Sequence, residues 1–403
     1  MRQFTPDHSF YRLRDLFFGG CFLILLASAG VSQNNDVCCE LSSSAKPIWR
    51  VALEPPVHAE GKCEWYSPDA YGTIVYTDSE TIVAGLHFRF CPQTTKESLG
   101  LRHVIDTILK IDSQTGKVLE KREWQDLSTE EQNWQGEIDV IPTRDGRFLV
   151  KVGRFLKLFS SDFKELKSRE LVENANGMVR ENWTVQVSPD GKTGLFKRWN
   201  HGPAIDHWFS TDTLDDEAVE TIPSEGRKSI NSASSVYFTP PRGGGLGDSL
   251  AHVRLRGQQE SHPLCPGCYG LPEGLLSDGT IFLATSPKAS FALVSEQGEM
   301  THRESLGEPM DSAWHVVSAS AARRFAFTFG HIQKRFMSWS IRMNLFVFDY
   351  HHMKDVLQLK FNQQIKNGIV APAGASPTPA LSPDGTRVAV LAGRVLKLFR
   401  VPD

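Results

Sequence analysis

The segment with the most reactive side chains is His262-Pro263-Leu264-Cys265-Pro266-Gly267-Cys268. Its two cysteines can close a disulfide across the Pro-Gly turn, or each can pair with another cysteine of the chain. The spacing also suits a metal site made of the histidine and both cysteines, but no second pair of ligands accompanies it. Thiol exchange is a third interpretation, although no predicted helix start activates the thiols. Covalent haem is excluded because Tyr269, not histidine, follows. We favour a disulfide and predict no metal.

Aromatic, arginine and histidine side chains gather in four segments that the strand pattern leaves as long connections. The segments are residues 87–103, 198–207, 256–274 and 330–342. Such side chains supply large contact areas, stacking and directed donors, a composition enriched at binding hot spots. The candidate ligand-binding residues are His87, Arg89, Arg198, Trp199, His201, His207, His331, Arg335 and Trp339. The alternative is that these side chains pack against one another and only order the loops.

Hydrolytic and phosphate-binding motifs are absent from the sequence. It contains no Gly-x-Ser-x-Gly, no His-Glu-x-x-His and no phosphate loop, so we predict no catalytic residue and no cofactor. The acidic run Asp212, Asp215, Asp216 and Glu217 is interpreted as a solvated hairpin tip instead of a calcium site. Asn182-Trp183-Thr184 matches a glycosylation sequon, which matters only in a host that glycosylates exported proteins.

The composition is that of an ordinary globular protein. The 403 residues carry a net charge of −3, and 40% of them are hydrophobic and 23% charged. These values exclude disordered, collagen-like and multi-pass membrane chains. The near balance of charge provides no field that would attract nucleic acid.

The first 29 residues resemble an export signal. Arg12 and Arg14 precede an apolar run at residues 16–26, and Ala27-Ser28-Ala29 offers small residues for cleavage. The run is shorter than the roughly 20 apolar residues that span a bilayer. We therefore predict an exported, periplasmic or extracellular protein with no membrane insertion after cleavage, and an uncleaved anchor is the alternative. Residues 30–45 form a polar lead.

Six cysteines remain after the signal is removed, and disulfides persist in an oxidising compartment. Cys63 and Cys91 are predicted to lie on one face of the fold, which makes their bridge the first to test. Cys265 and Cys268 are the other disulfide candidates. Adjacent Cys38 and Cys39 have no assigned partners.

Asp-Gly pairs followed by apolar runs recur along the chain, with their glycines at positions 146, 191, 279 and 385. The first separation, of 45 residues, corresponds to one repeat unit. The other two, of 88 and 106 residues, each correspond to two repeat units. The Gly-rich stretch 243–247 and Ala322-Arg323 are candidates for the two missing turns. The heptad at residues 153–159 also matches the one at 393–399, so one type of hairpin occurs near both ends.

Four short strands per period of about 45 residues are typical of a β-propeller blade. We predict a single all-β domain at residues 46–403 with seven four-stranded blades, and six or eight blades are alternatives. The last unit is one strand short, and residues 48–53 can complete it and close the ring.

The turns Ser188-Pro189-Asp190-Gly191 and Ser382-Pro383-Asp384-Gly385, with the strands after them, resemble bacterial WD-repeat-like propellers related to the TolB-like and YVTN-type families. The hairpin ending at residues 112–117 resembles quinoprotein-type blades, but their tryptophan-docking pattern is not evident. The resemblance implies a propeller fold and frequent export. It implies no particular activity, since such propellers include scaffolds, binding proteins and enzymes.

Connections between the second and third strands of a blade emerge on one face of a propeller, so we expect the four long segments to share that face. The leading hypothesis is a non-catalytic module that binds a protein, peptide or glycan there. A rival is a hydrolase or lyase that uses His87, His201 or His331 in the central funnel. A third possibility is a scaffold with apolar patches on the outer strands.

Overall fold

The computed structural model describes the residues in the ranges 42–54, 71–90, 103–125, 138–171, 182–199, 204–222, 228–230, 234–239, 250–258, 260, 262–266, 271–285, 288–295, 297–309, 315–319, 323–335, 338–365 and 377–403. All of them belong to one compact unit, Val37–Asp403. Within these ranges every long element is a strand, and no helix has the length and apolar character needed to cross a membrane.

The strands form antiparallel sheets that follow one another along the chain. Blade 1 contains β3 (Tyr71–Tyr76), β4 (Thr81–Phe90), β5 (His103–Asp112) and β6 (Val118–Gln125). Blade 2 contains β7 (Asp139–Pro142), β8 (Phe148–Val152), β9 (Phe155–Phe159) and β10 (Glu165–Glu170). Blade 3 contains β11 (Asn182–Val187), β12 (Thr193–Trp199), β13 (Ala204–Ser210) and β14 (Asp216–Ile222).

Blade 4 contains β15 (Lys228–Ile230), β16 (Ser234–Thr239), β17 (Leu250–Leu255) and β18 (His262–Pro263). Blade 5 contains β19 (Leu271–Leu275), β20 (Ile281–Thr285), β21 (Lys288–Val294) and β22 (Met300–Pro309). Blade 6 contains β23 (His315–Ala319), β24 (Arg324–Arg335), β25 (Ser338–Asp349), β26 (Lys354–Ile365) and β1 (Ser42–Ser43). Blade 7 contains β27 (Thr378–Leu381), β28 (Arg387–Ala392), β29 (Val395–Arg400) and β2 (Trp49–Ala52).

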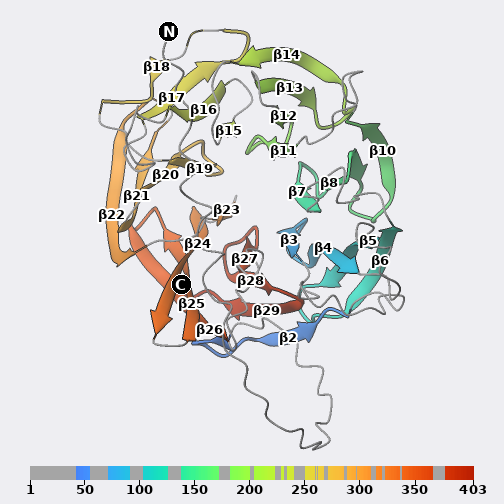
Figure 1. Cartoon of the computed structure of the whole chain (residues 1–403), viewed down its shortest axis with the longest axis vertical. Helices are drawn as coiled ribbons and strands as arrows, with labels where there is room; N and C mark the ends of the chain where they lie inside the picture. Colours follow the sequence, from blue (N-terminus) through green and yellow to red (C-terminus); the bar gives the residue numbers. More distant parts are fainter. Residues whose placement is uncertain are drawn as a thin grey trace, which may run out of the picture. The chain divides into compact units, whose positions relative to one another are not determined.

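The sheets are arranged in a ring around their first strands (Figure 1). Each of β3, β7, β11, β15, β19 and β23 contacts the first strand of the next blade, and β27 contacts β3. Six sheets have four strands, whereas blade 6 has a fifth, so the prediction of seven four-stranded blades is wrong for that sheet. The N-terminal strand β2 pairs antiparallel with β29, where the sequence placed it.

The Asp-Gly turns all join the first and second strands of a blade. Gly146, Gly191, Gly279 and Gly385 have φ between 69° and 87°, a region that glycine enters without steric cost. Arg323, with φ of 47°, precedes β24 and marks the equivalent turn of blade 6, as predicted. Residues 243–247, the other candidate, lie outside the described residues, and the first two strands of blade 4 are joined at residues 231–233.

We call the face with the Asp-Gly turns the lower face and the opposite one the upper face. The turns from third to fourth strand also lie on the lower face and share one geometry. A left-handed residue ends each turn, and these residues are Gly116, Phe163, Leu214, Gly298 and Met353. A β-bulge follows in all five hairpins. The bulges twist the edge strands, which discourages pairing with other chains.

Apolar side chains fill the space between neighbouring blades. Ile82 and Leu86 of blade 1 pack with Leu391 and Leu396 of blade 7. Phe163 is bulky yet left-handed (φ 62°), and its ring packs at 5.9 Å and 6.1 Å from those of Phe148 and Phe159 at the interface of blades 1 and 2. The left-handed backbone of Phe163 costs of order 1–3 kcal/mol, and burial of its ring offsets this cost.

Replacing Phe163 with glycine separates these two effects. We expect Phe163→Gly to lower the free energy of unfolding by about 2–4 kcal/mol, because the lost burial outweighs the relieved strain. Met353→Gly is the matched control, since Met353 has φ of 49° but is 43% exposed. It should change stability by less than about 1 kcal/mol. Urea denaturation of both variants tests this, and equal losses would contradict it.

Candidate functional site

The longest predicted loop is a pair of strands in the structure. Residues 330–342 lie mostly in β24 and β25, which pair from Arg324↔Asp349 to Arg335↔Ser338. Only residues 336–337 separate the two strands. The prediction of a loop is wrong here, and residues 338–345 of β25 do alternate polar and apolar side chains, as a strand does.

The other three segments also differ from the prediction. In residues 87–103 the strand β4 continues through Phe90 and β5 starts at His103, and in residues 198–207 strands cover all but 200–203. Residues 256–274 do not join a second to a third strand. They contain the β17–β18 connection, which faces the lower side, and the passage from β18 to β19. The expectation that all four segments decorate one face is therefore wrong for residues 256–261.

His87 lies inside blade 1. Its Nδ1 is 2.6 Å from Oδ1 of Asp106, directly across the β4–β5 ladder, and both side chains are 1% exposed. Gly85, two residues earlier on the same face of β4, packs toward Val140 and Ile138 of blade 2. The pair is thus enclosed between blades 1 and 2. A ligand on the upper face does not reach His87 in this structure.

The remaining candidates are spread over three blades. His207 lies in the middle of β13, with its ring stacked 4.4 Å from that of Phe196 and its Nδ1 3.5 Å from Asp216. Burial lowers the pKa of His207 against the attraction of Asp216. The structure gives backbone positions in the strands for Arg89, Arg198, Trp199, His331, Arg335 and Trp339. His201 lies outside the described residues.

Cys265 is buried at 7% exposure and is disulfide-bonded. Its partner lies outside the described residues, because the other six cysteines all do. The pairing of Cys265 with Cys268 and that of Cys63 with Cys91 therefore stay predictions. No group of three or more histidine, cysteine or acidic residues within the described ranges is arranged to hold a metal ion.

The acidic run of blade 3 lies at the β13–β14 turn, where Asp215 is 73% exposed, and it also forms ion pairs with the neighbouring blades. Asp212 binds Arg144 and, at 2.6 Å, Arg147 of blade 2. Asp215 lies 3.5 Å from Lys167. Glu217 reaches the other way and contacts Arg256 of blade 4 at 2.9 Å. We call this set the acidic clasp.

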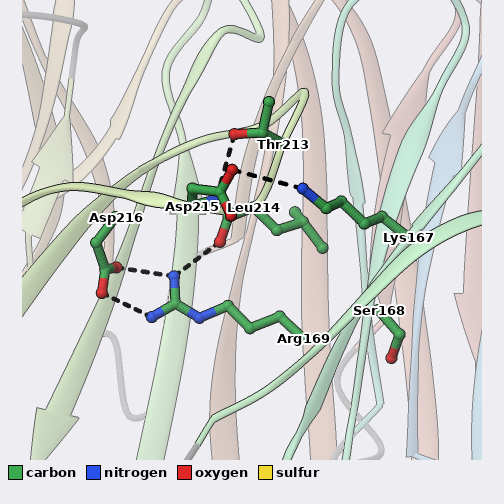
Figure 2. A pocket seen from close by; sticks show the side chains of 7 residues that line it. All are labelled: Lys167, Ser168, Arg169, Thr213, Leu214, Asp215 and Asp216. Atoms are coloured by element: carbon green, nitrogen blue, oxygen red, sulfur yellow. Dashed lines mark hydrogen bonds and ion pairs between the residues drawn. The ribbon is translucent and has the colours of Figure 1, made fainter.

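Asp216 completes the acidic clasp beside a pocket of about 360 Å³ between β10 and the β13–β14 turn. Figure 2 shows Arg169 pointing at Asp216, with two hydrogen bonds of 2.8 Å and a third to the Leu214 carbonyl. The Arg169 guanidinium also lies 4.7 Å from the Phe196 ring. Although partial burial opposes it, Arg169 lowers the pKa of Asp216. Every charged group lining the pocket has a partner in it, so its architecture is that of an interblade contact.

Strand length makes the upper face uneven. The second strands of blades 1 and 6 have 10 and 12 residues, whereas β28 of blade 7 has 6 and β8 of blade 2 has 5. At about 3.4 Å per residue, blade 6 adds up to about 20 Å of strand beyond blade 7, and blade 1 about 14 Å. Blade 7 therefore forms a low step between two tall blades.

The acidic clasp predicts a specific response to acid. The pKa of both Asp212 and Asp216 is lowered from 3.8, so their stabilisation is complete above that pH and is lost as pH falls through the folded pKa. We expect Asp212→Asn with Asp216→Asn to cost about 1 kcal/mol at pH 7, since both carboxylates are partly exposed, and progressively less as the pH falls below 3.8. Asp145→Asn, at a carboxylate that is 78% exposed, is the control. A cost that is as large at pH 2 as at pH 7 in urea titrations would contradict the assignment.

Comparison with known proteins supports the fold. No family model and no curated protein matches the chain. An uncharacterised protein of Listeria monocytogenes is 9% identical with a TM-score of 0.50, over 83% of this chain and 96% of that one. The propeller domain of the Trilobed protease from Pyrococcus furiosus is 11% identical with a TM-score of 0.49, covering 83% and 95%. A TolB from Agrobacterium tumefaciens is 13% identical with a TM-score of 0.42, covering 75% and 100%. The ring of sheets shows that the chain is a β-propeller.

Proposed function

We propose that the chain is an exported binding module, periplasmic or extracellular, that holds a protein, peptide or glycan on its upper face and performs no chemistry of its own. The observation that carries this proposal is the low step of blade 7 between tall blades 1 and 6. Uneven rims of this kind present strand surfaces to a partner on two sides. Arg89, Arg335 and Trp339 belong to the tall blades and stay the proposed contacts there.

The enzymatic alternative finds less support. It requires histidines and a carboxylate gathered in one accessible pocket, and His87 does meet Asp106 at 2.6 Å. That pair is enclosed between two blades at 1% exposure, where a substrate has no access. A buried histidine with a carboxylate partner is an expected way to satisfy polar groups inside a sheet.

A scaffold that uses blade flanks also finds less support. Within the part of the chain that the structure describes, the exposed large apolar residues are spread over the seven blades, among them Leu119 on β6, Leu166 on β10 and Val219 on β14. Single exposed apolar residues are normal on protein surfaces and do not form an assembly patch. Leu119 and Leu166 are moreover the extra residues of the edge-strand bulges.

Substitution on the tall blades tests the proposed function. The full chain is screened against a peptide library and a glycan array, and the ligands found are measured with Arg89→Ala, Arg335→Ala and Trp339→Ala combined. We expect at least about a tenfold loss of affinity, as for hot-spot residues, with nearly unchanged thermal stability. Lys167→Ala on the lower half of the rim is the matched control and should bind normally. The proposal is contradicted if the ligands bind the triple variant as tightly as the original chain. It is also contradicted if the screen finds no ligand.

A further inference from the structure

The two matching heptads build the same hairpin in blades 2 and 7. Gly153 and Gly393 have φ of 53° and 57°, and the arginine after each ends the turn between second and third strand. The carbonyls of Arg154 and Arg394 accept hydrogen bonds from Leu171 and Leu53, each at 2.7 Å. Both leucines are 2% exposed. Arg154 and Arg394 therefore occupy the same position in their blades.

Arg154 contacts a carboxylate and an aromatic ring, and Arg394 has neither of these neighbours within the described part of the chain. In blade 2, Nε of Arg154 is 2.9 Å from the Glu170 carboxylate, and the guanidinium lies 5.6 Å from the Phe155 ring. Glu170 and Phe155 face each other across the β9–β10 ladder. In blade 7 the corresponding cross-strand pair is Ala52 and Val395. An alanine and a valine thus stand where blade 2 holds an anion and an aromatic ring.

Arg394 has no replacement for these partners. Among the residues that the structure describes, none forms a hydrogen bond or ion pair with its guanidinium. The residue is half-buried and follows the upper end of β28 in the low step, and blade 7 packs between blades 1 and 6. A partly desolvated guanidinium attracts an anion more strongly than a fully solvated one.

We propose that Arg394 binds a glutamate or aspartate side chain of a peptide segment that crosses blade 7, an inference that rests on the proposed function. The carboxylate of the partner takes the place that Glu170 has beside Arg154. A planar guanidinium matches a carboxylate with two parallel hydrogen bonds, which lysine cannot reproduce. The same low step that admits the peptide chain also brings its acidic side chain to the arginine.

The experiment uses the full chain and two labelled synthetic peptides, one with alternating glutamate and glycine and the other with glutamine in place of glutamate. Fluorescence anisotropy at low ionic strength gives both dissociation constants. We expect the glutamate peptide to bind, and Arg394→Gln to weaken it by at least about tenfold. Arg154→Gln, at the equivalent position, should change the constant by less than twofold because that arginine already has a partner.

Ala52→Glu is the second variant. It supplies in blade 7 the carboxylate that Glu170 supplies in blade 2, so it should block the peptide as strongly as Arg394→Gln without loss of stability. Equal binding of the two peptides, no binding of the glutamate peptide, or an effect of Arg154→Gln as large as that of Arg394→Gln would overturn the assignment. If the triple variant on the tall blades loses the library ligands and Arg394→Gln does not change the binding of the glutamate peptide, only this inference is overturned. If the triple variant retains those ligands, the proposed function itself fails.

Discussion

A four-stranded sheet with two apolar faces is stable only when both faces are covered, and this constraint organises the whole molecule. Each blade covers an apolar face of the neighbouring blade. The last blade therefore has to pack against the first, which closes the ring. Thr73 illustrates the contact at the inner strands, where its hydroxyl bonds the backbone of Val140 in the next blade at 2.7 Å. Thr378 of blade 7 bonds the carbonyl of Gly72 at 3.2 Å and completes the circle.

The parts of the fold that local turn chemistry determines were accessible from the sequence. An Asp-Gly pair specifies a tight turn wherever it occurs, so four first turns, their period and the propeller followed from it. The match between residues 153–159 and 393–399 identified equivalent hairpins, and counting strands assigned β2 to the last blade. These features need no knowledge of distant residues.

Features that depend on distant partners were not accessible. Asp212 is neutralised by Arg147 and Arg144, which lie 65 and 68 residues earlier in the chain. The sequence around Asp212 does not predict these partners. His87 looks like a loop residue until β4 is extended by the pairing that buries it against Asp106. The height of blade 6 was missed for the same reason, since strand length above a ring is set by mutual pairing. Of the candidate site, the sequence indicated the residues of the tall blades but not the step between them.

The pairing of both N-terminal strands with the last two blades also has a consequence for how the protein is made. β1 and β2 leave the ribosome first, yet their partners come last, and Ser44 bonds Lys360 across 316 positions of sequence. Until β26 and β29 have been synthesised, β1 and β2 have no strand to pair with. Contacts between such remote segments slow folding, so the nascent chain passes through a long period with unprotected β-edges. A holding chaperone during synthesis or transport would shield them from aggregation.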